Sequence, residues 1–274
     1  TKASVVQTRT LTLPHFDFFI DIDGVLYDGN LPIEGGPEAI RFIRSIRGQI
    51  LLVTNTTRMS VSRVEEQLAT FGYDIPGDEI FAVSQATVDY VTRHYGKARC
   101  FLITDSSVED MFRQAGHTVI QDASPRDADV VVMGISKWPD FGQLDAAWHL
   151  IEGGAEPIAM HRDPTFPDGG IMRLGLGGIV AALESVTDIP ITTIGKPNAG
   201  FFQLALAKSG FDPEHTIMIG DSLEADIRGA RSMGLKTLFV RSGANADAPT
   251  PVDSDWELPS IGALPAWYRE TFPS

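Results

Sequence analysis

Short apolar runs alternate along the chain with stretches whose apolar residues recur at helical spacing. The runs lack the every-second-residue alternation of a half-exposed sheet, so each is predicted to be a strand buried on both faces. They lie at residues 18–20, 50–53, 101–103, 130–133, 158–160, 191–194, 217–219 and 238–240. Strands that alternate with helices pair in parallel and carry helices on both faces.

Helices are predicted between these runs, at residues 37–47, 60–71 and 199–209. Each begins beside a Pro or Ser and is followed by a Gly, which are the residues that favour helix starts and helix ends. The predicted fold class is therefore α/β, built on a doubly wound parallel sheet.

Charge and composition exclude several classes of partner. The chain has 22 Lys and Arg against 36 Asp and Glu, a formal net charge of −14. No basic run could neutralise phosphates, so no nucleic-acid partner is expected. The acidic balance also argues against an anionic membrane surface, and no apolar stretch reaches the ~18 residues of a membrane span.

Cysteine usage and the start of the chain bear on location. Cys100 is the single cysteine, which excludes an internal disulfide and fits a reducing, cytoplasmic compartment. Residues 1–13 contain no apolar segment of signal-peptide length, so secretion is not expected. A targeting remnant stays an alternative, because this segment has no acids and five Ser or Thr.

Two acidic residues follow the run 18–20 directly. Asp21 and Asp23 are two residues apart, so in an extended chain both carboxylates point the same way. Such carboxylates repel each other, and one takes up a proton unless a cation lies between them. A solvated acidic turn would produce the same pattern.

Polar residues also follow two other runs. Thr54 and Asn55 lie in a turn rich in hydroxyl and amide donors, which suits an anion as well as a helix N-cap. Lys196 lies just before a helix start, where the helix dipole gives a cation no benefit. A nearby anion explains this lysine better than the dipole does, although most lysines are simply exposed.

The fourth polar segment follows the run 217–219. Asp221 ends that strand and Asp226 lies five residues on, where acids could also serve as helix caps. All four segments share one position, the carboxyl end of a buried strand, and in a parallel sheet these ends line one crevice. Carboxylates gathered there predict Mg²⁺ with a phosphate held by Lys196 and Thr54, and an Asp beside the ion could attack phosphorus.

In this order, the four segments resemble the motifs of haloacid dehalogenase-like phosphatases. They read Asp-Ile-Asp-Gly-Val-Leu from Asp21, Val-Thr-Asn ending at Asn55, Gly-Lys-Pro around Lys196, and Gly-Asp at Asp221 with Asp226. The resemblance spans roughly residues 14–243 and indicates the nitrophenylphosphatase-like class, with a large α/β cap inserted between the second and third motifs. Residues 54–57 and 161–162 are similar to the branch of the haloacid dehalogenase-like hydrolase domain-containing and phospholysine phosphohistidine inorganic pyrophosphate phosphatases.

The resemblance implies a Mg²⁺-dependent phosphatase that hydrolyses small phosphate monoesters through an aspartyl-phosphate intermediate. Asp21 would be the nucleophile, and Asp23 the general acid and then the base. Mg²⁺ would be bound by Asp21, the main-chain carbonyl of Asp23, and Asp221, with Asp226 next to these ligands and not on the ion itself.

Phosphate binding is implied for Thr54, the main-chain N–H of Asn55, and Lys196. Ala225 departs from the family pattern, since many members carry Thr before the acid that corresponds to Asp226. This change is expected to loosen a supporting hydrogen bond and to leave the acids in place.

The resemblance also divides the chain. Residues 14–79 and 188–243 would form the catalytic core, 80–187 the cap, and 244–274 a tail packed on the core. His161 and Arg162, which follow a predicted cap strand, are candidates for reading the substrate, although a solvated loop explains them equally well. A homodimer through the cap is expected by analogy alone.

Two other functions stay open. A phosphoryl-transferring mutase would use the same motifs, but mutases of this family usually carry another cap type. A catalytically weak binder of phosphorylated ligands or proteins would have no need for Asp23 beside Asp21. The expected partner is a small phosphorylated metabolite that the sequence does not identify.

Overall fold

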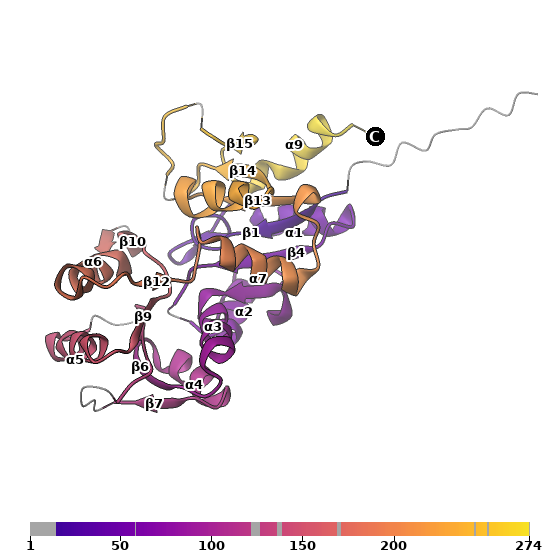
Figure 1. Cartoon of the computed structure of the whole chain (residues 1–274). Coiled ribbons are helices and arrows are strands. Elements are labelled where there is room, and N and C mark those ends of the chain that lie inside the picture. Colours follow the sequence, from indigo (N-terminus) through magenta and orange to yellow (C-terminus); the bar gives the residue numbers. More distant parts are fainter. Residues whose placement is uncertain are drawn as a thin grey trace, which may run out of the picture.

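The computed structural model describes residues 15–57, 59–121, 127–135, 139–168, 171–243, 245–250 and 252–273. The targeting remnant considered for residues 1–13 lies outside these ranges. Two parallel sheets organise the described chain (Figure 1).

The larger sheet has six strands, all parallel, in the order β15-β14-β13-β1-β4-β5. Their bounds are β1 (Asp17–Ile20), β4 (Ile50–Thr54), β5 (Ile80–Ala82), β13 (Thr216–Gly220), β14 (Lys236–Val240) and β15 (Trp256–Leu258). Along the chain, β4 and β5 are added on one side of β1, and β13, β14 and β15 are then added on its other side. The point where the strand order reverses therefore lies between β1 and β13. Ligands of doubly wound folds bind at the carboxyl ends of the strands at such a switch.

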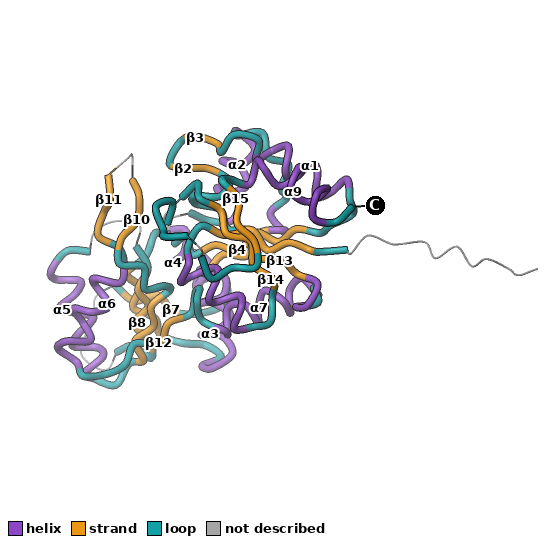
Figure 2. The backbone as a smooth tube through the Cα atoms, turned by 90° about the horizontal axis from the view of Figure 1, so that it is seen from above, coloured by secondary structure: helices purple, strands orange, loops and turns teal. Residues whose placement is uncertain are grey.

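Helices cover both faces of this sheet, as the view from above shows (Figure 2). Phe18 and Ile20 pack in one apolar cluster with α1 and α9, while Phe19 points to the other face, in the cluster that holds Phe201 of α7. Buried strands read as continuous apolar runs because successive side chains enter opposite layers. The core helices are α1 (Gly36–Ser45), α2 (Val61–Thr70), α7 (Ala199–Ser209), α8 (Gly229–Ser232) and α9 (Leu264–Thr271), with the π-helix η3 (Leu223–Arg228).

The smaller sheet has five parallel strands in the order β12-β9-β8-β6-β7. Its elements are β6 (Arg99–Ile103), β7 (Thr118–Ile120), β8 (Val130–Met133), β9 (Glu156–Ala159) and β12 (Thr192–Thr193), with helices α3 (Val83–Tyr95), α4 (Ser106–Gln114), α5 (Phe141–Glu152) and α6 (Leu176–Thr187). We call this part, residues 83–193, the cap, and the rest of the described chain the core.

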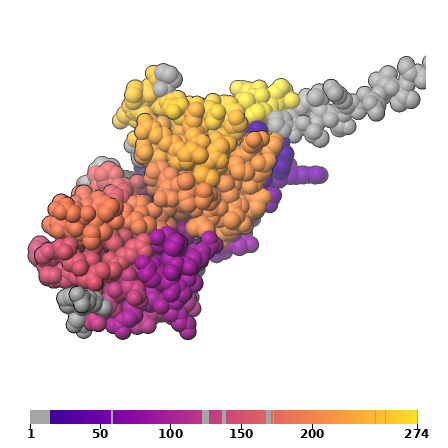
Figure 3. All heavy atoms as spheres, viewed as in Figure 1, coloured from indigo at the N-terminus to yellow at the C-terminus, as the bar shows by residue number. Residues whose placement is uncertain are grey.

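Two hairpins and three short 3₁₀ segments complete the described structure. The hairpins are β2 (Tyr27–Asp28) with β3 (Leu31–Pro32) in the core, and β10 (Thr165–Asp168) with β11 (Ile171–Leu174) in the cap; the 3₁₀ segments are η1 (Gly77–Glu79), η2 (Pro213–His215) and η4 (Ile261–Ala263). One apolar cluster continues from the larger sheet through α3 into the cap, and the space-filling view shows the two parts packed together (Figure 3).

The predicted α/β class, a doubly wound parallel-sheet core with an inserted α/β cap, is confirmed, and all eight predicted runs are strands. Sheet pairing moves two of the expected boundaries. β5 pairs with β4 in the core, so the cap begins after residue 82 rather than at 80. β12 pairs with β9 in the cap, so the core resumes after residue 193 rather than at 188.

The C-terminal segment does more than cover the core. β15 adds an edge strand to the larger sheet and α9 packs against α1, while the rings of Trp256 and Trp267 lie 5.2 Å apart, edge to face. Among the described helices, none combines the length and apolar character that crossing a bilayer requires.

Candidate active site

The four polar segments meet at the carboxyl edge of the larger sheet. Asp21 follows β1, Thr54 ends β4, and Asp221 follows β13. Lys196 arrives from the loop between β12 and α7, the point where the chain returns from the cap. Residues from distant parts of the sequence therefore converge on one place, as predicted.

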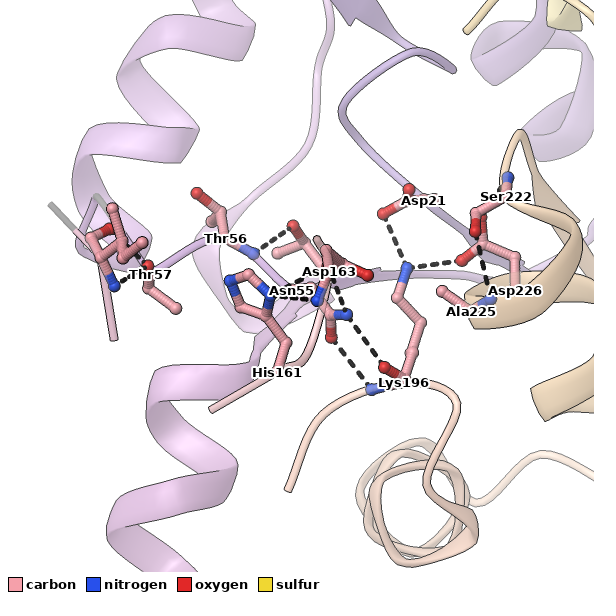
Figure 4. Close-up of polar contacts among 12 residues, drawn as sticks. Asp21, Asn55, Thr56, Thr57, His161, Asp163, Lys196, Ser222, Ala225 and Asp226 are labelled. Atoms are coloured by element: carbon pink, nitrogen blue, oxygen red, sulfur yellow. Dashed lines mark hydrogen bonds and ion pairs between the residues drawn. The ribbon is translucent and has the colours of Figure 1, made fainter. Parts of the chain in front are cut away.

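Lys196 lies at the centre of this group (Figure 4). Its Nζ is 2.8 Å from Asp21 Oδ1 and 2.7 Å from Asp226 Oδ1, and it donates to the carbonyl of Val53 at 2.9 Å. An ammonium has three donors, so these contacts use all of them. Only 1% of the residue is exposed, and so deep a charge is tolerated because it is paired.

The protonation of this group follows from burial and mutual charge. Burial opposes the charge of Lys196, but the carboxylates of Asp21 and Asp226 outweigh that effect and raise the pKa of the ammonium above its ordinary value. Burial raises the pKa of Asp21 well above its ordinary range, and Lys196 offsets only part of that rise. Repulsion from Asp226 and Asp221 adds to it. The site therefore holds more negative charge than one ammonium can neutralise.

Asp21, Asp221 and Asp226 each bring a carboxylate oxygen within 4.8 Å of the other two. Both oxygens of Asp226 already have a protein donor, Lys196 Nζ at Oδ1 and the main-chain N–H of Ser222 at Oδ2, 3.1 Å away. Asp226 is thus engaged in holding Lys196 and the start of η3. Asp21 and Asp221 are the carboxylates best placed to bind a metal ion.

The surroundings of Asp221 fit a bound cation. Gly24 and Gly243 lie so close to this side chain that a methyl group on either would overlap Asp221 Oδ2. The hydroxyl of Ser242 donates to the carbonyl of Gly24 at 2.7 Å, which ties the two glycine loops together. A set of carboxylate oxygens in such a cradle matches the hard oxygen ligands that Mg²⁺ prefers.

Ala225 leaves Asp226 supported. Its main-chain N–H bonds to the hydroxyl of Ser222 at 3.1 Å, and Ser222 in turn donates its own N–H to Asp226. The loss of a threonine hydroxyl at residue 225 therefore leaves the acid anchored from two sides, by Ser222 and by Lys196.

The turn after β4 is organised by its own side chains. Thr54 is buried, and its hydroxyl oxygen accepts the main-chain N–H of Thr56 at 3.0 Å. The Asn55 carboxamide bonds the main chain of Lys196 in both directions, accepting its N–H at 3.0 Å and donating to its carbonyl at 3.1 Å. The second and third motifs are thereby locked to each other.

Asp23 lies half-buried in the turn that follows Asp21. Its main chain bridges to Tyr27, whose carbonyl accepts the N–H of Gly24 at 2.8 Å. Its carboxylate is not one of the three that come together. The metal contact expected through the main-chain carbonyl of Asp23 and the acid–base role of its side chain stay predictions.

The two cap candidates differ in their surroundings. Arg162 makes four hydrogen bonds, all within the cap, to both carboxylate oxygens of Glu184, to Thr193 and to the carbonyl of Ile191. These bonds tie α6 to β12, and the substrate-reading role expected of Arg162 stays a prediction. His161 instead lies with its Nδ1 3.0 Å from Asp163 Oδ2, next to the turn after β4 (Figure 4).

Sequence reasoning missed two contributors. Asp163 accepts a 3.3 Å hydrogen bond from the Asn55 side chain, across the boundary between cap and core. Asn245, expected in the tail, accepts the N–H of Leu223 at 2.9 Å and so caps the start of η3. The only sequence signal for Asp163 was its place beside His161 and Arg162.

Such a site, acidic and lysine-centred at the switch point of a parallel sheet and facing an inserted cap, defines a class of hydrolases. The haloacid dehalogenase-like hydrolase model matches residues 18–118, and a HAD-hydrolase-like model matches residues 193–261. The chain is 32% identical over 255 residues to haloacid dehalogenase-like hydrolase domain-containing protein 2 of Bos taurus, covering 93% of this chain and 92% of that protein. It belongs to the haloacid dehalogenase-like hydrolase family.

Other relatives carry names of phosphatases. The dihydroxyacetone phosphatase of Corynebacterium glutamicum is 28% identical, with 85% of this chain and 84% of that protein covered. Among solved structures, the p-nitrophenyl phosphatase from Archaeoglobus fulgidus superposes with a TM-score of 0.85 at 25% identity, over 93% of this chain and 100% of that one. The chain shares the fold of this structure, the inserted α/β cap included.

Proposed function

We propose that the protein is a Mg²⁺-dependent phosphatase that hydrolyses small phosphate monoesters through an aspartyl-phosphate on Asp21. The observation that carries this proposal is the contact of Asp21 with the buried Lys196, 2.8 Å apart, at the carboxyl edge of the sheet beside Asp221. An ammonium held beside a carboxylate at the carboxyl end of a strand suits a carboxylate nucleophile that attacks an anionic phosphate group.

In the first step, an oxygen of the Asp21 carboxylate forms a bond to phosphorus as the ester P–O bond breaks. Asp23, as a carboxylic acid, gives its proton to the leaving oxygen, so the product leaves as an alcohol. Lys196 keeps the Asp21 carboxylate oriented, and Thr54 with the main-chain N–H of Asn55 would bind the phosphate oxygens.

In the second step, the Asp23 carboxylate takes a proton from water. The resulting hydroxide oxygen bonds to phosphorus, the bond between phosphorus and Asp21 breaks, and inorganic phosphate leaves. Asp21 is again a carboxylate and Asp23 again an acid, so the cycle closes.

Asp21 and Asp221, with the main-chain carbonyl of Asp23, are the residues that would hold Mg²⁺. The ion, when bound, offsets the repulsion among the carboxylates and between them and the phosphate. Asp226 would support the site without binding the ion, since both of its oxygens accept hydrogen bonds, from Lys196 and from Ser222.

The proposed substrates are small phosphorylated metabolites. Supporting this, relatives are named dihydroxyacetone phosphatase, sugar-phosphatase and 5′-nucleotidase. A mutase would return phosphate to a second hydroxyl of the same molecule, so product analysis with a hexose phosphate separates the two reactions.

The test is phosphate release from p-nitrophenyl phosphate with and without Mg²⁺, by the wild type and by Asp21→Asn. The variant keeps the shape of the side chain but cannot form the acyl phosphate, so turnover should fall by many powers of ten. Acid quenching with labelled substrate should trap phosphate on wild-type protein alone. Activity of Asp21→Asn within tenfold of wild type, or full wild-type activity in excess chelator, would refute the proposal.

A further inference from the structure

The cap loop that reaches the catalytic edge is held rigidly by its neighbours. Gly177, at the start of α6, donates its N–H to the carbonyl of Asp163 at 3.0 Å. A methyl group on Gly175 would overlap that carbonyl oxygen, and one on Gly177 would overlap the carbonyl oxygen of Arg162. The side chain of Arg162 is fastened to Glu184. The loop backbone therefore has little freedom relative to the cap.

One carboxylate of this loop, that of Asp163, contacts the core (Figure 4). Asp163 Oδ2 accepts from Asn55 Nδ2 at 3.3 Å and lies 3.0 Å from His161 Nδ1. Burial would raise the pKa of Asp163, but its bonds to His161 and Asn55 and the charge of Lys196 hold the pKa below the ordinary value. The side chain is therefore a carboxylate, a strong acceptor for the amide of Asn55.

Asn55 has two amide hydrogens, and each has its own acceptor. One is directed to the carbonyl of Lys196 and the other to Asp163, while the amide oxygen takes the N–H of Lys196. The contacts thus form a chain from the cap carboxylate through Asn55 to the main chain of Lys196, whose Nζ holds Asp21.

We propose that Asp163 is a positioning residue of the phosphatase: while the cap lies against the core, it holds Asn55, and through Asn55 it sets the place of Lys196 and of the phosphate-binding turn. This inference rests on the proposed function for its effect on turnover. Without the acceptor on the cap, one amide hydrogen of Asn55 loses its partner, and the carboxamide is free to turn away from Lys196. Displacement of catalytic groups by about 1 Å can cost on the order of 10²-fold in rate.

A second cap–core contact offers a matched control. The buried hydroxyl of Thr57 donates to the carbonyl of Ile135 at 2.6 Å and accepts its N–H at 3.0 Å. This contact also fastens the turn after β4 to the cap, but no described hydrogen bond links Thr57 to the side chain of Asn55 or to Lys196. Thr57→Val removes the hydroxyl and keeps the shape, so it loosens the cap without releasing Asn55.

The experiment compares Asp163→Ala, Asp163→Asn and Thr57→Val, with Asp145→Asn on the exposed face of α5 as a surface control. With p-nitrophenyl phosphate and Mg²⁺, Asp163→Ala should lower kcat by about 10- to 100-fold, with a much smaller change in KM. Asp163→Asn should recover most of the loss, because its carboxamide oxygen still accepts from Asn55. Thr57→Val should lower the melting temperature at least as much as Asp163→Ala does, with a smaller loss of kcat.

A double-mutant cycle tests the route through Asn55. If Asp163 acts by holding Asn55, then adding Asp163→Ala to Asn55→Ala should cost little more than Asn55→Ala alone. Fully multiplicative losses, or equal kcat in Asp163→Ala and Thr57→Val, would overturn the positioning role.

Hydrogen exchange gives a readout that does not depend on activity. Peptides that contain residues 53–57 and 194–198 should exchange their amide hydrogens faster in Asp163→Ala than in Thr57→Val. Unchanged exchange in both peptides would overturn the inference even for an active enzyme. Conversely, a wild type that releases no phosphate would refute the proposed function, and the exchange experiment would still decide the role of Asp163.

Discussion

The core and the cap have the same architecture, a parallel sheet flanked by helices, yet they differ in where charge is buried. Among the described residues, the buried Lys, Asp and Glu are Lys196, Asp221 and Asp226, all at the carboxyl edge of the core sheet. In the cap, His117 is the buried residue of the described part that could become positively charged. Burying a charge costs free energy unless the charge is paired. The buried charged side chains of the core sheet therefore distinguish the core, which carries the candidate active site, from the cap, which covers it.

The carboxyl edge of the cap sheet contributes in another way. His161 and Asp163 follow β9 there, and the Asp163 side chain is 40% exposed. The two residues contact each other, and Asp163 also accepts a hydrogen bond from Asn55 of the core. The comparison shows that the fold alone does not determine reactivity, because both parts share it. The reactive groups are the paired charges at one edge of the core, and the cap orients them.

The largest expected effect comes from removing the central charge of the core. Lys196→Met keeps most of the side-chain volume but leaves the buried Asp226 and the partly buried Asp21 without their cation. Breaking a buried pair in this way typically costs 3–5 kcal/mol, so unfolding by urea should show a loss of about that size, and phosphatase activity should vanish. Lys208→Met, which removes an exposed lysine of α7, is the control and should change stability little. A Lys196→Met protein as stable as wild type would contradict the idea that the core edge depends on paired charge.

The next effect tests whether Asp23 does proton transfer rather than binding. Asp23→Asn should slow ester hydrolysis by about 10²- to 10⁴-fold. The loss should be smaller for esters of acidic phenols, because their leaving oxygens need less protonation. Kinetics across a series of aryl and alkyl phosphates measure this, with Asp28→Asn on the exposed β2–β3 hairpin as the control. Equal losses across the series would remove the acid role from Asp23.

A smaller effect is expected from crowding the metal cradle. Gly243→Ala would push a methyl group against Asp221 Oδ2. Changes beside metal ligands typically cost about 10- to 100-fold in metal affinity or activity, so calorimetric titration should show Mg²⁺ binding weakened by that factor. Gly142→Ala at the start of α5 in the cap is the matched control. Unaltered Mg²⁺ binding by Gly243→Ala would count against Asp221 as a ligand.

Sequence patterns predicted the sheets well where strands are long and apolar. The runs that became β1, β4, β8 and β13 were found because buried parallel strands read as continuous apolar segments. β5 and β15, which form the two edges of the larger sheet with three residues each, were not predicted. β12 was recognised as a strand but expected in the core, since a short apolar run does not reveal which sheet it joins.

The site residues, too, divide into those that the sequence pattern could predict and those that depend on contacts with distant parts of the chain. Asp21, Thr54, Lys196 and Asp221 could be expected together because each ends a strand, and parallel strands end at one edge. Asp163 and Arg162 could not be told apart, because adjacent residues of a loop point in different directions that only packing decides. Arg162 turned to Glu184, and Asp163 to Asn55, which lies 108 residues away.

The smallest predicted effect concerns the cap, where the buried His117 should make the stability of the protein depend on pH. Burial lowers the pKa of this imidazole below its ordinary value of 6.5. Its Nδ1 accepts the N–H of Ala98 at 3.1 Å, and its Nε2 lies 2.9 Å from the hydroxyl of Thr92, which itself donates to Val88. Nε2 therefore carries the hydrogen, and protonation of Nδ1 would break the bond from Ala98.

Because the folded pKa of His117 is depressed, the unfolded chain binds a proton that the native protein does not as pH falls below about 6.5. Stability should therefore drop from that pH down to the folded pKa, with a slope from this one residue of at most about 1.4 kcal/mol per pH unit. His117→Gln should flatten the fall in unfolding free energy between pH 7 and 5, whereas His149→Gln on the exposed face of α5 should not. If His117→Gln kept the full slope, the acid sensitivity would have to originate at the charged edge of the core instead of inside the cap.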